Sequence, residues 1–244
     1  MTSERAFTLD DTEVEFEPGD SLLTAALASD RYIPHLCAHP DFSPHGSCRV
    51  CLVEVDGHNR PACTTAAQPG MTIRSDIEPI NVMRRQLLQL LFVEGNHFCP
   101  SCEQSGQCQL QATVYTVGMT DLHYPPLGPR RELDASHPDL LLDRDRCIGC
   151  ELCVKASSEV DQKHIFSLGG RGTHTQLIVN SEHNQLGETD MTPDDRAAHI
   201  CPVGVILFKT GNYAQPTGQR LYDQQPISAI GNHRAEDVDL PPTP

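Results

Sequence analysis

The chain has 244 residues, of which 38% are hydrophobic and none is Trp, a composition that favours small units over one large core. Its formal net charge of −15 argues against nucleic-acid binding, which needs a positive surface. No stretch reaches the roughly 20 apolar residues of a membrane span, and the N-terminus lacks an apolar signal region, so we expect a cytoplasmic protein. Disulfides are rare in the cytoplasm, so the 11 cysteines favour metal binding.

Residues 1–76 are predicted to form a first domain of strands and one short helix. Asp20 or Ser21 can cap the helix of "SLLTAALAS". Alternating apolar and polar residues and β-branched runs predict strands at 6–16, as a hairpin, and at 50–55 and 71–74. This order indicates a ferredoxin-like β-grasp unit.

Four cysteines of this domain have the spacing C-x10-C-x2-C-x11-C: Cys37, Cys48, Cys51 and Cys63. The plant-type 2Fe–2S loop has C-x4-C-x2-C and a distant fourth cysteine, so here the first gap is longer. The insert "AHPDFSPHGS" contains Gly46, which permits the backbone to turn its N–H groups towards sulfur. We expect one 2Fe–2S cluster at this first set.

Residues 77–120 are predicted to form a helical second domain. A helix is expected from Ile77 to Val93, with Pro79 in its first turn and Gly95 after its end. Another short helix is expected at 110–117. The apolar stripe expected to pack in the core is Ile80, Met83, Leu87 and Leu91.

The second cysteine set follows the long helix with the spacing C-x2-C-x5-C: Cys99, Cys102 and Cys108. Three cysteines are one ligand short of the four that a cluster usually takes. Counting cysteines along the chain leaves no twelfth thiol, so His97 is the expected fourth ligand of a 4Fe–4S cluster.

Residues 121–138 are predicted to be a linker or an extended docking segment, and 139–225 a third domain with ferredoxin-like character. Its cysteines are spaced C-x2-C-x2-C with a remote Cys-Pro: Cys147, Cys150, Cys153 and Cys201. This is the bacterial ferredoxin run with its fourth ligand relocated, because Ser157 occupies the usual fourth position. One 4Fe–4S cluster is expected here, with Cys201 delivered by a helix that starts at Thr192.

The remaining motifs carry no assigned chemistry. The glycine-rich stretch Gly169 to His174 lacks the strand–turn–helix setting of a nucleotide loop and is predicted to be a hairpin turn. No nucleophile–base constellation is found, so no catalytic residue is assigned. Residues 226–244 are expected to be a tail, and its last stretch, "AEDVDLPPTP", is expected to be disordered or partner-bound. The fold class is therefore α+β, in three cluster-binding domains.

The order of the sets resembles the N-terminal part of the large iron–sulfur subunit of respiratory complex I. The same module occurs in iron-only hydrogenases and NAD-linked formate dehydrogenases. In complex I and iron-only hydrogenases three residues separate the histidine from its first cysteine, whereas here only Phe98 does. With "HICPVGVIL" and "GNYAQPTGQRLY", the chain more closely resembles the small diaphorase (gamma) subunit of cytosolic bidirectional NAD(P)-linked nickel–iron hydrogenases, over roughly residues 5–225.

This resemblance implies a relay of single electrons through one 2Fe–2S and two 4Fe–4S clusters. It implies a flavin-bearing NAD(H) subunit on one side and, on the other, a hydrogenase small subunit with its large nickel–iron subunit. The reaction of that family converts H2 and NAD+ into NADH and a proton, and its electrons meet the 2Fe–2S cluster first from the flavin side. The order of the two 4Fe–4S clusters in space stays open.

Two alternatives remain at this stage. The first is an equivalent relay subunit of an NAD-linked formate dehydrogenase or of a complex I variant. The second is a zinc-stabilised interaction protein, because zinc accepts sites of four cysteines or of three cysteines and one histidine.

Overall fold

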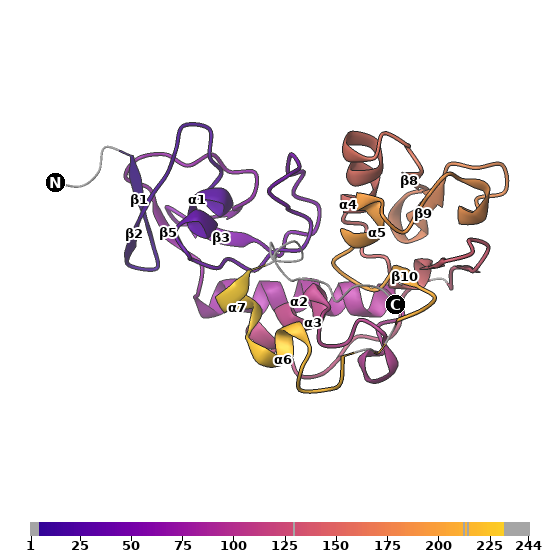
Figure 1. Cartoon of the computed structure of the whole chain (residues 1–244). Helices are drawn as coiled ribbons and strands as arrows, with labels where there is room; N and C mark the ends of the chain where they lie inside the picture. Colours follow the sequence, from indigo (N-terminus) through magenta and orange to yellow (C-terminus); the bar gives the residue numbers. More distant parts are fainter. Residues whose placement is uncertain (1–4, 129, 212, 214, 232–244) are drawn as a thin grey trace.

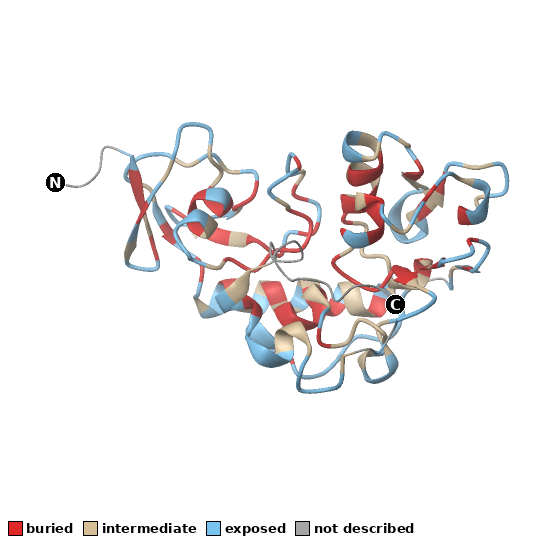
Figure 2. Ribbon diagram, viewed as in Figure 1, coloured by how far each residue is buried: buried red, intermediate tan, exposed pale blue. Residues whose placement is uncertain are grey.

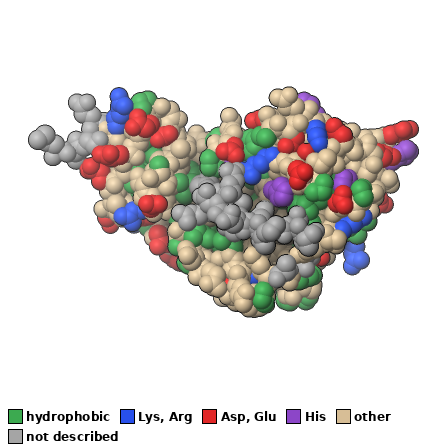
Figure 3. All heavy atoms as spheres, in the orientation of Figure 1, with side chains coloured by type: hydrophobic (Ala, Val, Ile, Leu, Met, Phe, Trp, Pro, Cys, Tyr) green, Lys and Arg blue, Asp and Glu red, His purple; other side chains and the backbone are tan. Residues whose placement is uncertain are grey.

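The computed structural model describes residues 5–128, 130–211, 213 and 215–231. Figure 1 shows three regions: a strand-rich N-terminal unit, a long central helix α2, and a C-terminal unit that contains α4, α5 and the last strands. The described helices include none that is both long and apolar enough to cross a membrane. Acidic and basic side chains are interspersed over the face shown in Figure 3.

The N-terminal unit is a five-stranded mixed sheet with the order β2-β1-β5-β3-β4. Its strands are β1 (Ala6–Leu9), β2 (Thr12–Glu15), β3 (Leu52–Val55), β4 (His58–Pro61) and β5 (Thr72–Arg74). The expected hairpin is present as the antiparallel β1–β2 pair, and β1 also pairs in parallel with β5. Helix α1 (Leu22–Ala28) is capped by Ser21, whose side chain accepts a hydrogen bond from the backbone N–H of Thr24.

Helix α2 (Glu78–Glu94) connects this unit to the rest of the molecule. It begins with Pro79 in its first turn and ends at Gly95, as the sequence predicts. Of the predicted apolar stripe, Ile80 is buried and Leu91 packs against the core, whereas Met83 and Leu87 are only half-buried. The buried face also carries polar side chains, and its residues are Ile80, Arg84, Leu88, Gln89 and Val93. A second helix, α3 (Gln109–Thr116), follows the second cysteine set.

The segment predicted to be a linker lies in contact with α2 and with the C-terminal unit. The Gln89 side chain accepts a hydrogen bond from the backbone N–H of His123 and donates one to the carbonyl of Asp121. Near its end, β6 (Leu133–Asp134) pairs with β7 (Leu140–Asp143). The segment is therefore an extended, docked connection.

The C-terminal unit is built from short elements around the third cysteine set. Its three-stranded sheet has the order β10-β7-β6, and β8 pairs with β9 in a separate hairpin. The expected turn at residues 169–174 joins that hairpin. The elements not yet given are α4 (Leu152–Lys155), β8 (Phe166–Gly169), β9 (Gln176–Val179), α5 (Arg196–His199) and β10 (Ile206–Phe208).

The helix expected to start at Thr192 begins later, at Arg196. Its N-cap is Asp195, whose carboxylate accepts hydrogen bonds from the backbone N–H and the hydroxyl of Thr192. The same carboxylate forms an ion pair with Lys163, at 2.8 Å. The acidic residue therefore closes a turn before the helix, and the one-turn helix still ends just before Cys201.

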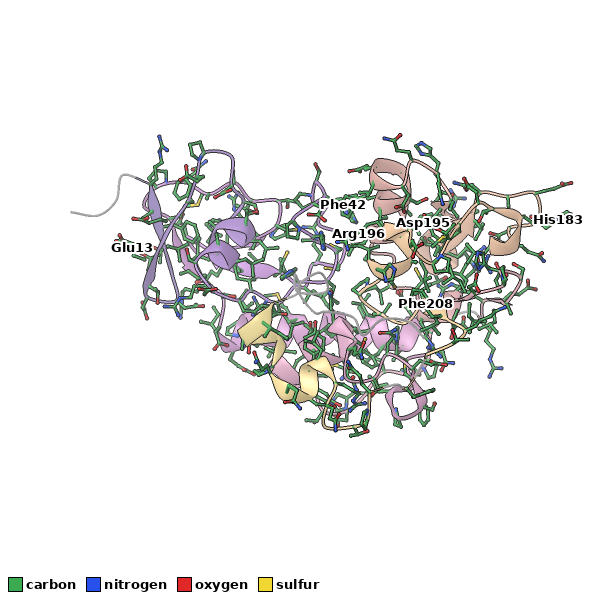
Figure 4. The ribbon with its side chains drawn as sticks, in the orientation of Figure 1. Glu13, Phe42, His183, Asp195, Arg196 and Phe208 are labelled. Carbon is green, nitrogen blue, oxygen red and sulfur yellow. The ribbon has the colours of Figure 1, made fainter. Side chains whose placement is uncertain are left out.

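The insert in the first cysteine loop reaches the C-terminal unit. The Arg196 guanidinium lies 3.3 Å from the carboxylate of Asp41, and Lys155 donates a hydrogen bond to the carbonyl of Ser43. Figure 4 labels Phe42 and Arg196 at this junction. Phe42 is buried and shares one hydrophobic core with residues of the C-terminal unit, so the buried residues in Figure 2 extend from one unit into the other.

The C-terminal arm folds back over the second domain (Figure 1). It contains α6 (Leu221–Gln224) and α7 (Ile227–Ile230). Tyr222 donates its backbone N–H to the carbonyl of Gly106, and Ile227 is buried. The predicted start of the tail, at residue 226, falls between these two helices, so α7 belongs to the folded arm. The rest of the predicted tail, from residue 232 onwards, lies outside the described residues.

Candidate metal centres

The second cysteine set surrounds one cavity, with about 330 Å³ of empty space including its open mouth. Cys99 begins a 3-10 turn (Cys99–Ser101) and Cys102 ends it, while Cys108 is the N-cap of α3. The cavity lining includes all four predicted ligands, His97, Cys99, Cys102 and Cys108. The structure thus brings the expected histidine and the three sulfurs to one space.

His97 presents an unsatisfied nitrogen in this region. Its Nε2 atom is buried and has no hydrogen-bond partner. Burial, reinforced by the charge of Arg146, lowers the pKa of His97 to about 4, so the imidazole is neutral at pH 7. The ring packs on Phe92, with centroids 5.3 Å apart. A neutral imidazole with a free lone pair is the form that binds metals.

Gly95 permits this placement of the ring. A Cβ atom on Gly95 would come within 2.9 Å of His97 Nε2 and within 2.5 Å of the carbonyl oxygen of Asp145. The same carbonyl accepts a hydrogen bond from the backbone N–H of Asn96, at 2.8 Å. The glycine that ends α2 is therefore also required by the close approach of the histidine loop to the C-terminal unit.

The third cysteine set surrounds a second cavity, with about 320 Å³ of empty space including its mouth. The lining includes Cys147, Cys150, Cys153 and Cys201. Gly149 has φ +64° and donates its N–H to the sulfur of Cys147 at 3.4 Å, a bond that stabilises a thiolate ligand. Ser157 is buried, and its hydroxyl accepts the backbone N–H of Ile165, so this residue serves the turn after α4.

Burial disfavours the free thiolates of this set. It raises the pKa of Cys201 to about 11 and the pKa values of Cys150 and Cys153 well above the ordinary thiol value. A metal ligand must be a thiolate, so the positive charge of bound iron is needed to stabilise the deprotonated form. Four buried cysteines are therefore more stable as ligands of a metal centre than as free thiolates.

The first cysteine set is buried in the N-terminal unit, and its four members are Cys37, Cys48, Cys51 and Cys63. Cys37 and Cys48 alter each other's pKa, as do Cys51 and Cys63, so the four thiols lie in two close pairs. Gly46 has φ +69°, and a Cβ there would lie 3.2 Å from the Cγ2 atom of Thr64, which follows Cys63. The positive φ and this close approach favour glycine where the insert passes the end of the first set.

The third set lies near both of the others. Cys37 of the first set lies close enough to Cys150 of the third set for its charge to contribute to the raised pKa of Cys150. On the other side, the backbone N–H of Gln109 donates to the carbonyl of Pro202 at 2.9 Å. Gln109 follows Cys108 and Pro202 follows Cys201, so a single hydrogen bond joins the backbone beside ligands of the second and third sets.

Arg146 is a residue of this junction that the sequence patterns did not single out. Its Nη1 lies 3.6 Å from the sulfur of Cys102, and the residue itself precedes Cys147. Two carboxylates balance its charge: Glu103 at 2.6 Å and Asp143 at 2.7 Å. The only signal in the sequence is an arginine next to a predicted ligand in "DRDRC", which is too common a pattern to indicate a role.

The donors of the second and third sets surround open spaces. Among the described residues, no three or more His, Cys, Asp or Glu side chains converge to hold a single metal ion. A zinc site would need four donors about 2.0–2.3 Å from one point. Cysteines placed around a cavity suit a polynuclear cluster, in which the ligands bind different irons.

Comparisons with protein families agree with the grouping of the cysteines into three sets. Residues 4–78 match the 2Fe-2S iron-sulfur cluster binding domain. Residues 84–123 match the NADH-ubiquinone oxidoreductase-G iron-sulfur binding region, and residues 140–208 match the 4Fe-4S single cluster domain. Each match contains one of the three cysteine sets, so iron–sulfur clusters are the metal centres of this chain.

The gamma subunit of the NAD-reducing hydrogenase HoxS from Cupriavidus necator is 37% identical over 223 residues, covering 91% of this chain and 94% of that protein. The chain belongs to this family. A chain in the crystal structure of an NAD+-reducing [NiFe]-hydrogenase in the H2-reduced state has the same fold, with a TM-score of 0.90 and 48% identity. That likeness covers 94% of this chain and 98% of the other.

Longer relatives contain the same module. The alpha subunit of an NADPH-Fe(3+) oxidoreductase from Geobacter sulfurreducens is 31% identical over 84% of this chain, which spans 24% of that subunit. A subunit of the NADH-quinone oxidoreductase from Streptomyces coelicolor is 30% identical over 82% of this chain, which again spans 24% of the relative. Membership of this hydrogenase family, with the shared complex I module, assigns an iron–sulfur electron-relay role within an oxidoreductase.

Proposed function

We propose that the chain relays single electrons through one 2Fe–2S and two 4Fe–4S clusters. The 2Fe–2S cluster is held by the first set and a 4Fe–4S cluster by each of the other two. The observation that carries this proposal is His97, whose buried Nε2 lacks a partner at the edge of a cavity that three cysteines also line. In this proposal Cys201 completes the third set. All twelve positions are ligands, and none is catalytic in the sense of touching a substrate.

The fold proposed for these sites is more specific than a mixed α and β chain. The five-stranded sheet with α1 is a β-grasp ferredoxin-like domain, supported by the parallel β1–β5 pair between antiparallel neighbours. The histidine-ligated site is a helical domain between α2 and α3. The third site is a small ferredoxin-like domain, with its fourth ligand brought back by α5.

The proposed order of electron transfer is first set, third set, second set. The influence of Cys37 on Cys150 supports the first step, and the Gln109–Pro202 hydrogen bond supports the second. The order therefore differs from the order of the ligand sets along the chain. Such a chain of clusters moves one electron at a time, so two-electron chemistry with NAD(H) requires a flavin, which we place on a partner.

The proposed partners are a flavin-bearing NAD(H) subunit at the first set and a nickel–iron hydrogenase module beyond the second. This follows from HoxS and from the NAD+-reducing [NiFe]-hydrogenase structure, and the coverage of both relatives over most of their length supports it. The complex interconverts H2 plus NAD+ with NADH plus a proton, and the chain itself supplies the relay.

Metal analysis and co-purification test this function. The purified chain is expected to be brown, with about ten irons per chain from one 2Fe–2S and two 4Fe–4S clusters. In its host it should co-purify with a flavoprotein and a nickel protein. A colourless zinc protein would overturn the proposal. Co-purification with a molybdenum formate dehydrogenase, and no nickel, would select the alternative relay instead.

A further inference from the structure

Arg84 is a fully buried arginine beside the first cysteine set. It lies on α2, with 2% of its surface exposed, and its guanidinium points into the N-terminal unit. Nε donates to the carbonyl of Val50 at 3.2 Å, and Nη2 donates to the carbonyl of Leu52 at 2.8 Å. These two carbonyls stand on either side of Cys51 in the chain. The guanidinium thus clamps the backbone around one predicted ligand.

The other acceptors of Arg84 are also neutral. Nη1 donates to the carbonyl of Ser75 at 2.9 Å and to the side-chain oxygen of Asn81 at 3.0 Å, and Nη2 donates to the Ser75 hydroxyl at 2.8 Å. In the described part of the chain, no carboxylate forms an ion pair with it. A buried cation without a counter-charge is costly, because water no longer solvates it.

The groups that favour the charged form of Arg84 begin with a cysteine of the first set. Burial lowers the pKa of Arg84 to about 10, and the group that most favours its charged form is Cys51, ahead of Asp10 and Asp76. An iron–sulfur cluster with four thiolate ligands carries net negative charge. Such a cluster would supply the counter-charge that the neutral acceptors do not.

We propose that Arg84 is a positioning residue that raises the reduction potential of the 2Fe–2S cluster and fixes its loop to α2. Reduction adds one electron to the cluster, and a neighbouring cation stabilises the added charge. The effect is large because the guanidinium is buried, where the effective permittivity is far below that of water. This inference rests on the proposed assignment of a 2Fe–2S cluster to the first set.

Two variants change this charge in different ways. Arg84→Gln removes it. The double change Asn81→Asp with Asp76→Asn keeps Arg84 and the net charge of the chain, but places a carboxylate in hydrogen-bond contact with the guanidinium. The amide of Asn81 now donates a hydrogen bond to the carboxylate of Asp76 at 2.8 Å. In the double variant the new amide at position 76 can donate to the new carboxylate at position 81. Arg85→Gln is the matched control, because Arg85 is the adjacent arginine on α2 and pairs with the exposed Glu78.

The measurement is a redox titration of the full chain, followed by EPR, with the two 4Fe–4S clusters as internal references. Arg84→Gln should lower the 2Fe–2S midpoint by about 59 mV, a tenfold fall in the one-electron equilibrium constant. The double variant should lower it by a smaller amount, because it moves an existing carboxylate into contact with the guanidinium. The control and the 4Fe–4S midpoints should not move. If Arg84→Gln fails to fold, the double variant decides alone.

The outcomes separate this inference from the proposed function. An intact 2Fe–2S signal with an unchanged midpoint in the double variant overturns the role of Arg84 and leaves the relay standing. A shift of equal size in all three clusters also overturns it, because it would indicate a general structural effect. Absence of any 2Fe–2S signal in the unaltered chain overturns both.

Discussion

The guanidinium nitrogen Nη1 of Arg146 lies 3.6 Å from the sulfur of Cys102. Its guanidinium lines the cavity of the second set, and Arg146 precedes Cys147 of the third set in the chain. Burial alone would lower its pKa, but the bond to Glu103 and the charges of Cys102 and Asp143 raise it. The arginine therefore stays charged and can tune the cluster proposed for the second set.

Arg146→Gln is expected to lower the midpoint of the histidine-ligated cluster by about 59 mV, equivalent to a tenfold change. The loss of a donor to a thiolate sulfur and of a positive charge both disfavour the reduced state. Glu103→Gln should shift the midpoint upwards, because it removes the carboxylate that lies 2.6 Å from the guanidinium. EPR redox titration measures both, and equal shifts of the same sign would contradict this assignment.

Replacing His97 by Cys should keep the cluster and lower its potential, because a thiolate makes the cluster one charge more negative than a neutral imidazole does. His97→Ala should weaken the cluster or leave an iron without a protein ligand. The exposed His123 provides the control, since His123→Ala should change neither the EPR signal nor the potential of this cluster. An intact, unaltered EPR signal in His97→Ala would remove His97 from the ligand set.

Cys201→Ser tests the proposed order of the clusters. It should remove about four irons and leave the other two signals. When electrons are supplied through the flavin partner, the 2Fe–2S cluster should be reduced while the histidine-ligated cluster stays oxidised, because the intervening carrier is missing. Reduction of the histidine-ligated cluster at its normal rate would contradict the order. A chemical reductant that reaches every cluster serves as the control.

Gly106→Ala should destabilise the C-terminal arm. Gly106 has φ +80°, and a Cβ there would lie 2.3 Å from the Nε atom of Arg220, which also donates to the carbonyl of Ser105. Gly118→Ala is the control, because its φ is +69° but nothing lies within 4 Å of the added Cβ. Strain at positive φ costs about 1–2 kcal/mol in both.

Gly106→Ala should lower the free energy of unfolding by more than Gly118→Ala does. In Gly106→Ala, proteolysis should cut the arm before it cuts the rest of the chain. Denaturant titration and limited proteolysis measure these effects. Equal losses in the two variants would show that the contact between Gly106 and Arg220 contributes little to holding the arm.

Local sequence patterns predict the elements well where the interactions that form them are local. The hairpin of β1 and β2 and the two ends of α2 follow from alternation, a proline in the first turn and a terminal glycine. The buried face of α2 was predicted less well. Apolar periodicity does not anticipate a buried cation such as Arg84, which is satisfied by carbonyls 34 and 32 residues earlier in the chain.

The three cysteine sets follow from the sequence alone, because ligand spacing within a loop is a local property and the cysteine count leaves one place for His97. Their arrangement in space depends on the tertiary fold. The insert around Asp41 docks on Arg196, and the backbone beside Cys108 bonds to that beside Cys201. These contacts join residues far apart in the chain, so no spacing rule contains them, and they support a third set that lies between the first and the second.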